Sequence, residues 1–157
     1  MVGSIFILSC TQTNKPEAPT DTEEVTIALE SPSSSLTNYM ELKNYLGKSE
    51  TEASQLAAKA LIKSLTEENE ETDIIVTANA IAESNDPEKQ LELFQALTNQ
   101  FIASLKQGGV EKNVYVQFCP MAFDNSGGTW LSLSEEIENP YFGGEMLYCG
   151  SVQEILE

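Results

Sequence analysis

Apolar residues recur at helical spacing in four stretches of the chain, with polar residues between them. Intervals of three and four residues place such side chains on one face of an α-helix. The four stretches span residues 36–46, 53–65, 74–82 and 91–105. Since only short connections separate them, the pattern predicts four amphipathic helices packed as an antiparallel bundle.

Residues that commonly start and stop helices stand between these stretches. Gly47 follows the first one, and Ser49 with Glu52 three residues later predicts a capping box for the second. Asp86 followed by Pro87 predicts the N-cap and the first position of the fourth helix, and a glycine pair ends that helix.

The pattern changes to alternation after residue 109. Residues 113–118 alternate between apolar and polar side chains, which predicts a strand, and residues 129–133 predict a second one. Ser151 and Glu154 predict the start of a last short helix. The predicted fold class is therefore mainly α, with about four helices and a small C-terminal α+β, loop-rich cap.

The amino terminus has a different character. An apolar run ends in Ser9-Cys10, with Ile7 three positions before the cysteine, and this arrangement resembles the end of a bacterial lipoprotein signal peptide. The resemblance implies cleavage before Cys10, a lipid on its sulfur, and an anchored protein on the periplasmic side of the cell envelope. The alternative is a frayed N-terminus with an ordinary cysteine.

These patterns divide the chain into three parts. We expect a signal remnant over residues 1–9, and the attachment cysteine with a flexible tether rich in Thr, Ser, Pro and Glu over 10–34. Residues 35–157 form one globular domain, which consists of the helical bundle (35–109) and a cap rich in Cys and Met (110–157).

Composition narrows the classes of function. With 8 lysines against 25 acidic residues the chain carries a net charge of −17, so we expect no nucleic-acid partner and no attraction to anionic membrane surfaces. The absence of histidine and arginine excludes Ser-His-Asp triads, Cys-His pairs, His-ligated zinc and arginine clamps. We therefore expect a protein that binds or carries, and no enzyme.

Four sulfur-bearing residues stand close together in pairs near the C-terminus. Cys119 and Met121 are two apart, which places both side chains on one side of an extended chain, and Met146 and Cys149 are three apart, which suits a turn. If the two segments meet, four soft sulfurs converge. Such a set favours Cu(I) over Mg, Ca or Mn.

Neighbouring residues are candidates for shaping this site. Pro120 restricts Cys119 to extended geometry, and nearby aromatic rings would exclude water. The site-shaping candidates are Pro120, Phe123, Trp130, Asn139, Pro140, Tyr141, Phe142 and Gly143. In the alternative interpretation Trp130 is a core anchor and the segment from Asn139 is a structural turn.

A disulfide between Cys119 and Cys149 is the main alternative to a metal site. Thiols outside the cytoplasm tend to be oxidised, and closing a loop of about 30 residues would contribute about 3.6 kcal/mol. Met121 and Met146 would then be ordinary core residues. The two states are compatible, since a reduced pair can bind Cu(I) and an oxidised pair lock the loop.

The sequences Cys119-Pro-Met-Ala-Phe, Trp130-Leu-Ser and Asn139-Pro-Tyr-Phe-Gly, followed by Met146-Leu-Tyr-Cys149-Gly, resemble a bacterial domain of unknown function. That domain is found in lipoproteins of Bacteroidetes and fused to periplasmic adaptor proteins of copper/silver efflux systems. The resemblance covers residues 35–157, in motifs at the C-terminus and in pattern over the helices.

The resemblance implies an extracytoplasmic domain connected with copper or silver handling, whose partner is an efflux adaptor or another envelope protein. The Cys-Pro-Met segment also resembles short heavy-metal-binding modules, which usually continue with histidine. Here Ala122 occupies that position, which favours a soft monovalent metal over zinc. A disulfide-stapled interaction domain without metal is the alternative function.

Overall fold

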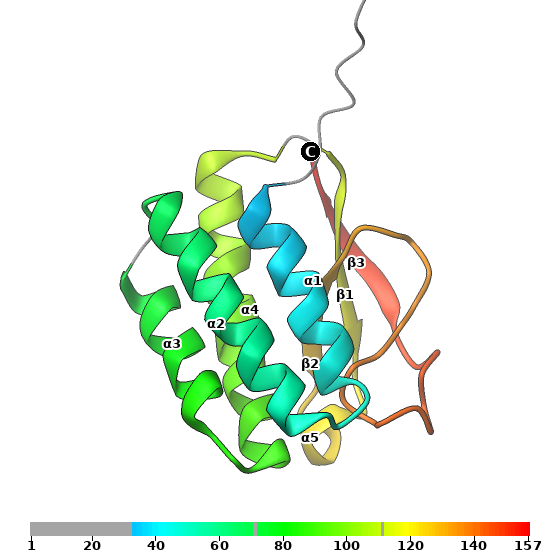
Figure 1. The fold of residues 1–157 in the computed structure, drawn as a ribbon. Coiled ribbons are helices and arrows are strands. Elements are labelled where there is room, and N and C mark those ends of the chain that lie inside the picture. The colour runs from blue at the N-terminus through cyan, green and yellow to red at the C-terminus, as the bar shows by residue number, and fades with distance from the viewer. Residues whose placement is uncertain (1–32, 71, 111) are drawn as a thin grey trace, which may run out of the picture.

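The computed structural model describes residues 33–70, 72–110 and 112–157. Four packed helices are followed by a small three-stranded antiparallel sheet, so the predicted fold class is confirmed (Figure 1). The elements in chain order are α1 (Ser34–Leu46), α2 (Thr51–Glu67), α3 (Thr72–Glu83), α4 (Pro87–Gly108), β1 (Val114–Cys119), α5 (Ala122–Asn125), β2 (Gly128–Ser132) and β3 (Ser151–Leu156).

The helices bury the apolar stripes that the sequence predicted. Leu61 of α2 and Ile81 of α3 are wholly buried, and between α1 and α4 the rings of Tyr39 and Phe94 stack with centroids 5.0 Å apart. Apolar burial of this kind is the main source of stability in a small domain. The core is therefore continuous through the whole bundle.

Helix starts follow the sequence at one place and depart from it at another. Asp86 caps α4 as predicted, since its Oδ1 accepts the N–H of Glu88 at 3.0 Å. The capping box predicted at Ser49 is wrong: Glu50 is the N-cap of α2, without a side-chain bond. Ser49 has a positive φ of 57° and its N–H donates to the carbonyl of Leu46, so it forms the turn that closes α1.

The sheet has the order β2-β1-β3, and both edge strands run antiparallel to β1. The short helix predicted over 151–156 is wrong, because these residues form β3 and satisfy the second edge of β1. Leu156, opposite Val114, is buried while most of β3 is exposed. β3 is thus an edge strand with a solvated outer side.

The other edge of the sheet meets the helices. On β2 the N–H of Leu131 donates to Tyr39 Oη at 3.1 Å, and the N–H of Thr129 donates to Gln95 Oε1 at 2.7 Å. Burial raises the pKa of Tyr39 far above its ordinary value, so the hydroxyl stays protonated; it also hydrogen-bonds Thr98 at 2.7 Å. Helical side chains thus satisfy the outer edge of β2 and fix the sheet against α1 and α4.

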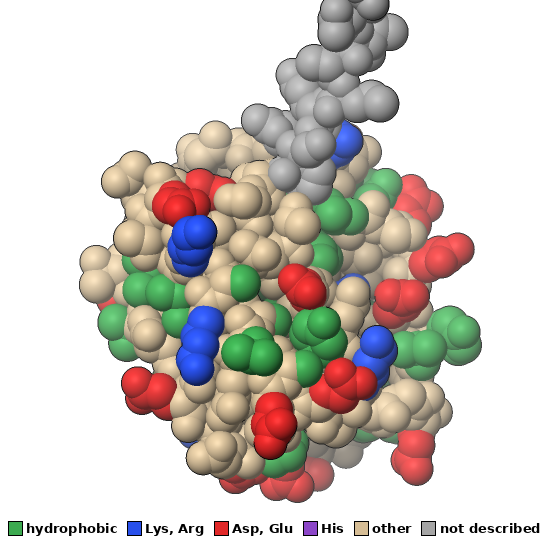
Figure 2. All heavy atoms as spheres, viewed as in Figure 1, with side chains coloured by type: hydrophobic (Ala, Val, Ile, Leu, Met, Phe, Trp, Pro, Cys, Tyr) green, Lys and Arg blue, Asp and Glu red, His purple; other side chains and the backbone are tan. Residues whose placement is uncertain are grey.

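The predicted lipid-attachment residue Cys10 and the tether as far as residue 32 lie outside the described residues. None of the helices that the structure describes has the length and apolar content needed to cross a membrane. Figure 2 shows acidic side chains spread over this face with few lysines among them, as the net charge of −17 requires.

Candidate functional site: the cysteine pair of the sheet

The pairing of β1 with β3 brings Cys119 and Cys149 together. Cys119 is the last residue of β1, and β3 begins two residues after Cys149. The register places Phe118 opposite Ser151. One step further along this antiparallel pair, Cys119 lies opposite Gly150, the direct neighbour of Cys149. Two cysteines separated by α5, β2 and a long loop therefore meet at one end of the sheet.

Gly150 makes this close approach possible. Its φ of +144° lies in the region that favours glycine, and an added Cβ would lie 2.8 Å from the Trp130 ring and 2.9 Å from the carbonyl oxygen of Phe118. Any side chain at this position would push the segment that carries Cys149 away from β1.

The two thiols lie close enough to interact, and both are free in the described part of the chain. Cys119 is wholly buried, whereas Cys149 is partly exposed. The hydrogen bond to Cys119 raises the pKa of the Cys149 thiol, and burial and the charge of Cys119 act in the same direction. At neutral pH the Cys149 thiol is therefore protonated. The pair has one buried sulfur, that of Cys119, and one partly exposed sulfur, that of Cys149.

Asn139 holds the segment that leads to Cys149. The side chain of Asn139 is buried, and its Nδ2 donates to the carbonyl oxygen of Cys149 at 2.9 Å. The backbone N–H of Asn139 donates to the carbonyl oxygen of Leu147 at 2.7 Å. Its Oδ1 accepts the N–H of Tyr141 at 2.9 Å, which closes a turn around Pro140. The motif at Asn139 is thus a turn that also positions Cys149.

Trp130 is a core anchor in this structure. It is wholly buried, and its Nε1 donates to Oε1 of Gln117 at 2.7 Å. The amide nitrogen of Gln117 donates to the carbonyl oxygens of Ser134 and Glu136, each at 3.0 Å. Gln117 therefore ties the loop after β2 to the centre of the sheet.

Sequence reasoning missed Gln117. In the alternation of residues 113–118 it occupies the side of the strand opposite Val114 and Val116, so the pattern gives it no buried role. The burial of Gln117 depends on the loop after β2, which covers that side. A polar residue between the apolar Val116 and Phe118 is the only signal in the sequence.

Met121 does not share a side of the chain with Cys119. β1 ends at Cys119, and Pro120 and Met121 form a turn in which Met121 has the helical values φ −90° and ψ −11°. The expectation that these two sulfurs face one point is wrong, because it assumed an extended chain through Pro120. The side chain of Met121 is 47% exposed.

Met121 lines a separate hollow of about 510 Å³, next to α4. Three of the predicted shielding residues, Phe123, Tyr141 and Phe142, line the same hollow, and the rings of Phe123 and Tyr141 lie 4.9 Å apart. The hydroxyl of Tyr141 donates to Gln95 Oε1 at 2.8 Å. These rings therefore pack at the junction with α4.

Met146 lies in the turn that precedes Cys149. The N–H of Cys149 donates to the carbonyl oxygen of Met146 at 3.0 Å, so the predicted turn is present, and Met146 is partly buried. Within residues 33–70, 72–110 and 112–157 there is no group of three Cys, Asp or Glu side chains suited to a metal ion. The candidate donors are therefore the two thiols, with the thioether of Met146 in the turn that precedes Cys149.

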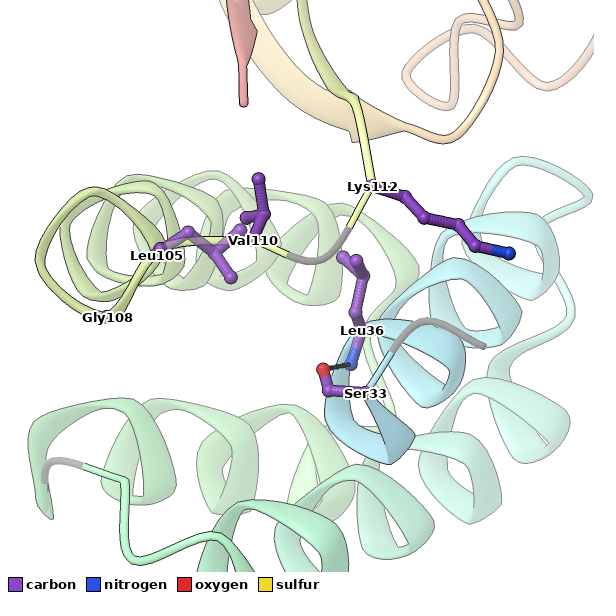
Figure 3. Close-up of a pocket in the computed structure, with 7 residues that line it drawn as sticks. Ser33, Leu36, Leu105, Gly108, Val110 and Lys112 are labelled. Carbon is purple, nitrogen blue, oxygen red and sulfur yellow. Dashed lines mark hydrogen bonds between the residues drawn. The ribbon is translucent and has the colours of Figure 1, made fainter. Parts of the chain in front are cut away.

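A smaller hollow of about 360 Å³ lies between the start of α1 and the end of α4 (Figure 3). Leu36, Leu105 and Val110 supply its apolar lining, and the N–H of Leu36 donates to the Ser33 Oγ at 3.3 Å. It is lined by no cysteine or methionine and does not enlarge the cysteine site.

Residues 36–113 match the model of a family described as protein of unknown function (DUF3347). No curated protein and no solved structure matches this chain. The matched range covers α1 to α4 and ends directly before β1, so it does not extend to the motifs around Cys119 and Cys149. Over residues 36–113 this chain is accordingly similar to the DUF3347 family, whose function is unknown.

Proposed function

We propose that this protein binds Cu(I) or Ag(I) through the thiols of Cys119 and Cys149. The observation that carries the proposal is that strand pairing brings these two thiols, which are far apart in the chain, close enough to interact. Thiolates are the donors that soft monovalent metals prefer. The metal is cargo in this proposal, and the protein performs no reaction on it.

The different depths of the two sulfurs suggest an order of binding. The partly exposed Cys149 meets the incoming ion first, and the buried Cys119 then completes the pair. Each thiol gives up its proton on binding, because the thiolate is the ligand. Since the pKa of Cys149 is raised, apparent affinity increases as the pH rises toward that pKa.

Met146 is the proposed third donor. A thioether binds a soft metal more weakly than a thiolate and exchanges easily, which suits transfer to another protein. Met121 lies in the hollow beside α4, and the proposal gives it no bond to the ion held by the cysteine pair.

The proposed cellular setting comes from the sequence. The signal-like run before Cys10 favours a lipid-anchored protein on the periplasmic side of the bacterial envelope. The resemblance of the C-terminal motifs favours a copper/silver efflux adaptor as partner. The task would be sequestration of the ion or its delivery to efflux.

A competition titration tests the binding proposal. The reduced full-length chain with Cys10→Ser is titrated with Cu(I) under anaerobic conditions against the chelator bicinchoninic acid. We expect one ion per chain, loss of competition in Cys119→Ser and in Cys149→Ser, and a smaller loss in Met146→Leu. Met40→Leu, a change in α1, is the matched control. Competition that persists in both cysteine variants contradicts the proposal.

The second candidate function is a disulfide-stapled interaction domain, which the same proximity of the two thiols favours. In that case the native protein has a mass two hydrogens lower before reduction, and the reduced protein does not compete with the chelator. The stapled form would present exposed apolar side chains near the pair, of which Tyr148 is the most exposed.

A further inference from the structure

A hollow of about 610 Å³ lies between the end of α1 and the loop that precedes β3. Lys43, Asn44 and Lys48 line it from the side of α1, and Glu138 and Gly143 from the side of the loop. This volume lies within the usual range for small-molecule sites. Neither Cys119 nor Cys149 lines the hollow. Asn139, which holds the carbonyl oxygen of Cys149, lies on its wall, so the hollow adjoins the segment of the proposed metal site.

Lys43 is the unusual residue of this hollow. It is only 5% exposed, yet it takes part in none of the ion pairs or side-chain hydrogen bonds found among the described residues. Gln100 Oε1 is the one fully buried side-chain nitrogen or oxygen atom without a partner among the described residues, so the Lys43 ammonium still reaches solvent in the hollow, where it has no protein acceptor. Burial lowers the pKa of Lys43, and the charge of the exposed Glu138 offsets this only in part.

The backbone around Lys43 is already engaged. The last carbonyl groups of α1 accept the N–H groups of the following turn: Gly47 donates to Lys43 at 3.0 Å and Ser49 to Leu46 at 2.9 Å. These bonds weaken the negative end of the α1 dipole. The ammonium is therefore left without a strong partner, and an anion in the hollow meets little repulsion from the helix end.

We propose that this hollow binds a small organic carboxylate, whose charged group pairs with the Lys43 ammonium. Lys48 on the same side adds a second positive charge, and the buried Pro140 with Leu147 supplies apolar contact for the body of the ligand. Charge-assisted hydrogen bonds from ammonium to carboxylate are among the strong ones in proteins. Such a ligand supplies the acceptor that Lys43 lacks.

Benzoate is the probe, and benzamide, which has the same shape without the charge, is its matched control. We expect saturable changes in the ¹H–¹⁵N signals of Gly143, Gly144 and Lys48 with benzoate only. The Nζ signal of Lys43 in the unmodified protein should shift during the same titration. Equal responses to the two compounds, or no saturable response to benzoate, would overturn the proposal.

Variants assign the effect to Lys43. Lys43→Met keeps a long side chain without charge, and we expect it to weaken benzoate binding roughly tenfold or more. Lys63→Met, at an exposed lysine of α2, should leave affinity unchanged. Glu138→Gln should tighten binding, because it removes a negative charge from the hollow. Unchanged affinity in Lys43→Met, with its helical signal intact, would also contradict the proposal.

Discussion

The helical bundle and the C-terminal sheet are built on different principles. In the bundle most buried side chains are apolar, and periodic stripes of Leu, Ile, Ala and aromatic residues pack on one another. In the sheet region Gln117, Asn139 and Trp130 are buried: the amide groups of Gln117 and Asn139 hydrogen-bond to loop backbone, and Trp130 donates to Gln117. The bundle thus depends on shape, and the sheet region on specific polar partners.

This difference determines where chemistry can arise. Apolar packing tolerates many similar sequences, since volume and pattern suffice. Buried polar networks fix one arrangement, because each unpaired group is costly. The cysteine pair lies in the second kind of environment, where Asn139 holds the carbonyl oxygen of Cys149.

The largest effect is expected from a cavity in the bundle. Leu61 of α2 is wholly buried, and Leu61→Ala should lower the free energy of unfolding by about 3 kcal/mol. Leu56 of the same helix is 67% exposed, and Leu56→Ala should change it by less than about 0.5 kcal/mol. Urea unfolding followed by circular dichroism measures both, and equal losses would contradict the assigned core.

A polar deletion in the sheet region comes next. Asn139→Ala leaves the N–H of Tyr141 and the carbonyl of Cys149 without their side-chain partner, which should cost about 2 kcal/mol. It should also speed alkylation of Cys149, because the segment loses the hydrogen bond that holds the carbonyl oxygen of Cys149. Asn99→Ala, at an exposed position of α4, is the control. If Asn139→Ala is destabilised but its Cys149 is alkylated at the unchanged rate, Asn139 stabilises the fold without positioning Cys149.

A smaller, pH-dependent effect is expected where α2 meets the start of α1. The carboxylate of Glu68 accepts the N–H of Ser35 at 3.0 Å and the hydroxyl of Ser34 at 2.7 Å. Partial burial raises the pKa of Glu68, but the hydrogen bonds from Ser35 and Ser34 outweigh it and hold that pKa below the ordinary 4.5.

Because the pKa is lower in the folded chain, the contribution of Glu68 to stability is complete above pH 4.5 and is lost as the pH falls through the folded value. Glu68→Gln should therefore cost about 1 kcal/mol at pH 7 and almost nothing at strongly acidic pH. Unfolding curves over this range test the sign. A difference that grows on acidification would refute the assignment.

The smallest effect is a change in the titration of one thiol. In the Cys10→Ser chain, Cys119→Ala removes the hydrogen bond that raises the pKa of Cys149. The midpoint of the pH–rate profile for alkylation of Cys149 by iodoacetamide should then move to lower pH. An unchanged midpoint would mean that the two thiols do not interact in solution.

The helices follow from the sequence because their cause is local. Spacing at three and four residues, Asp86 before Pro87, and Gly47 after the first stretch each act within a few residues. Two predictions of helix starts were wrong. Ser49 belongs to the turn that closes α1, where its N–H donates to Leu46, whereas over 151–156 a partner distant in the chain decides the structure. The short segment 151–156 becomes a strand since β1 offers an open edge.

The candidate site was predictable only in part, for the same reason. The sequence singled out Cys119 and Cys149, but their meeting depends on the register of β3, which was read as a helix. Met121 was misplaced, because the turn at Pro120 interrupts the alternation. Gln117 was missed, since its burial depends on the loop after β2.

The most direct test of the central claim is X-ray absorption at the copper edge of the one-to-one Cu(I) complex of the Cys10→Ser chain. The account predicts a first shell that contains only sulfur, and that loses sulfur when Cys149 is changed to Ser. A shell of nitrogen or oxygen donors, or a sulfur shell unchanged in Cys149→Ser, would contradict binding by the pair that β1 and β3 bring together.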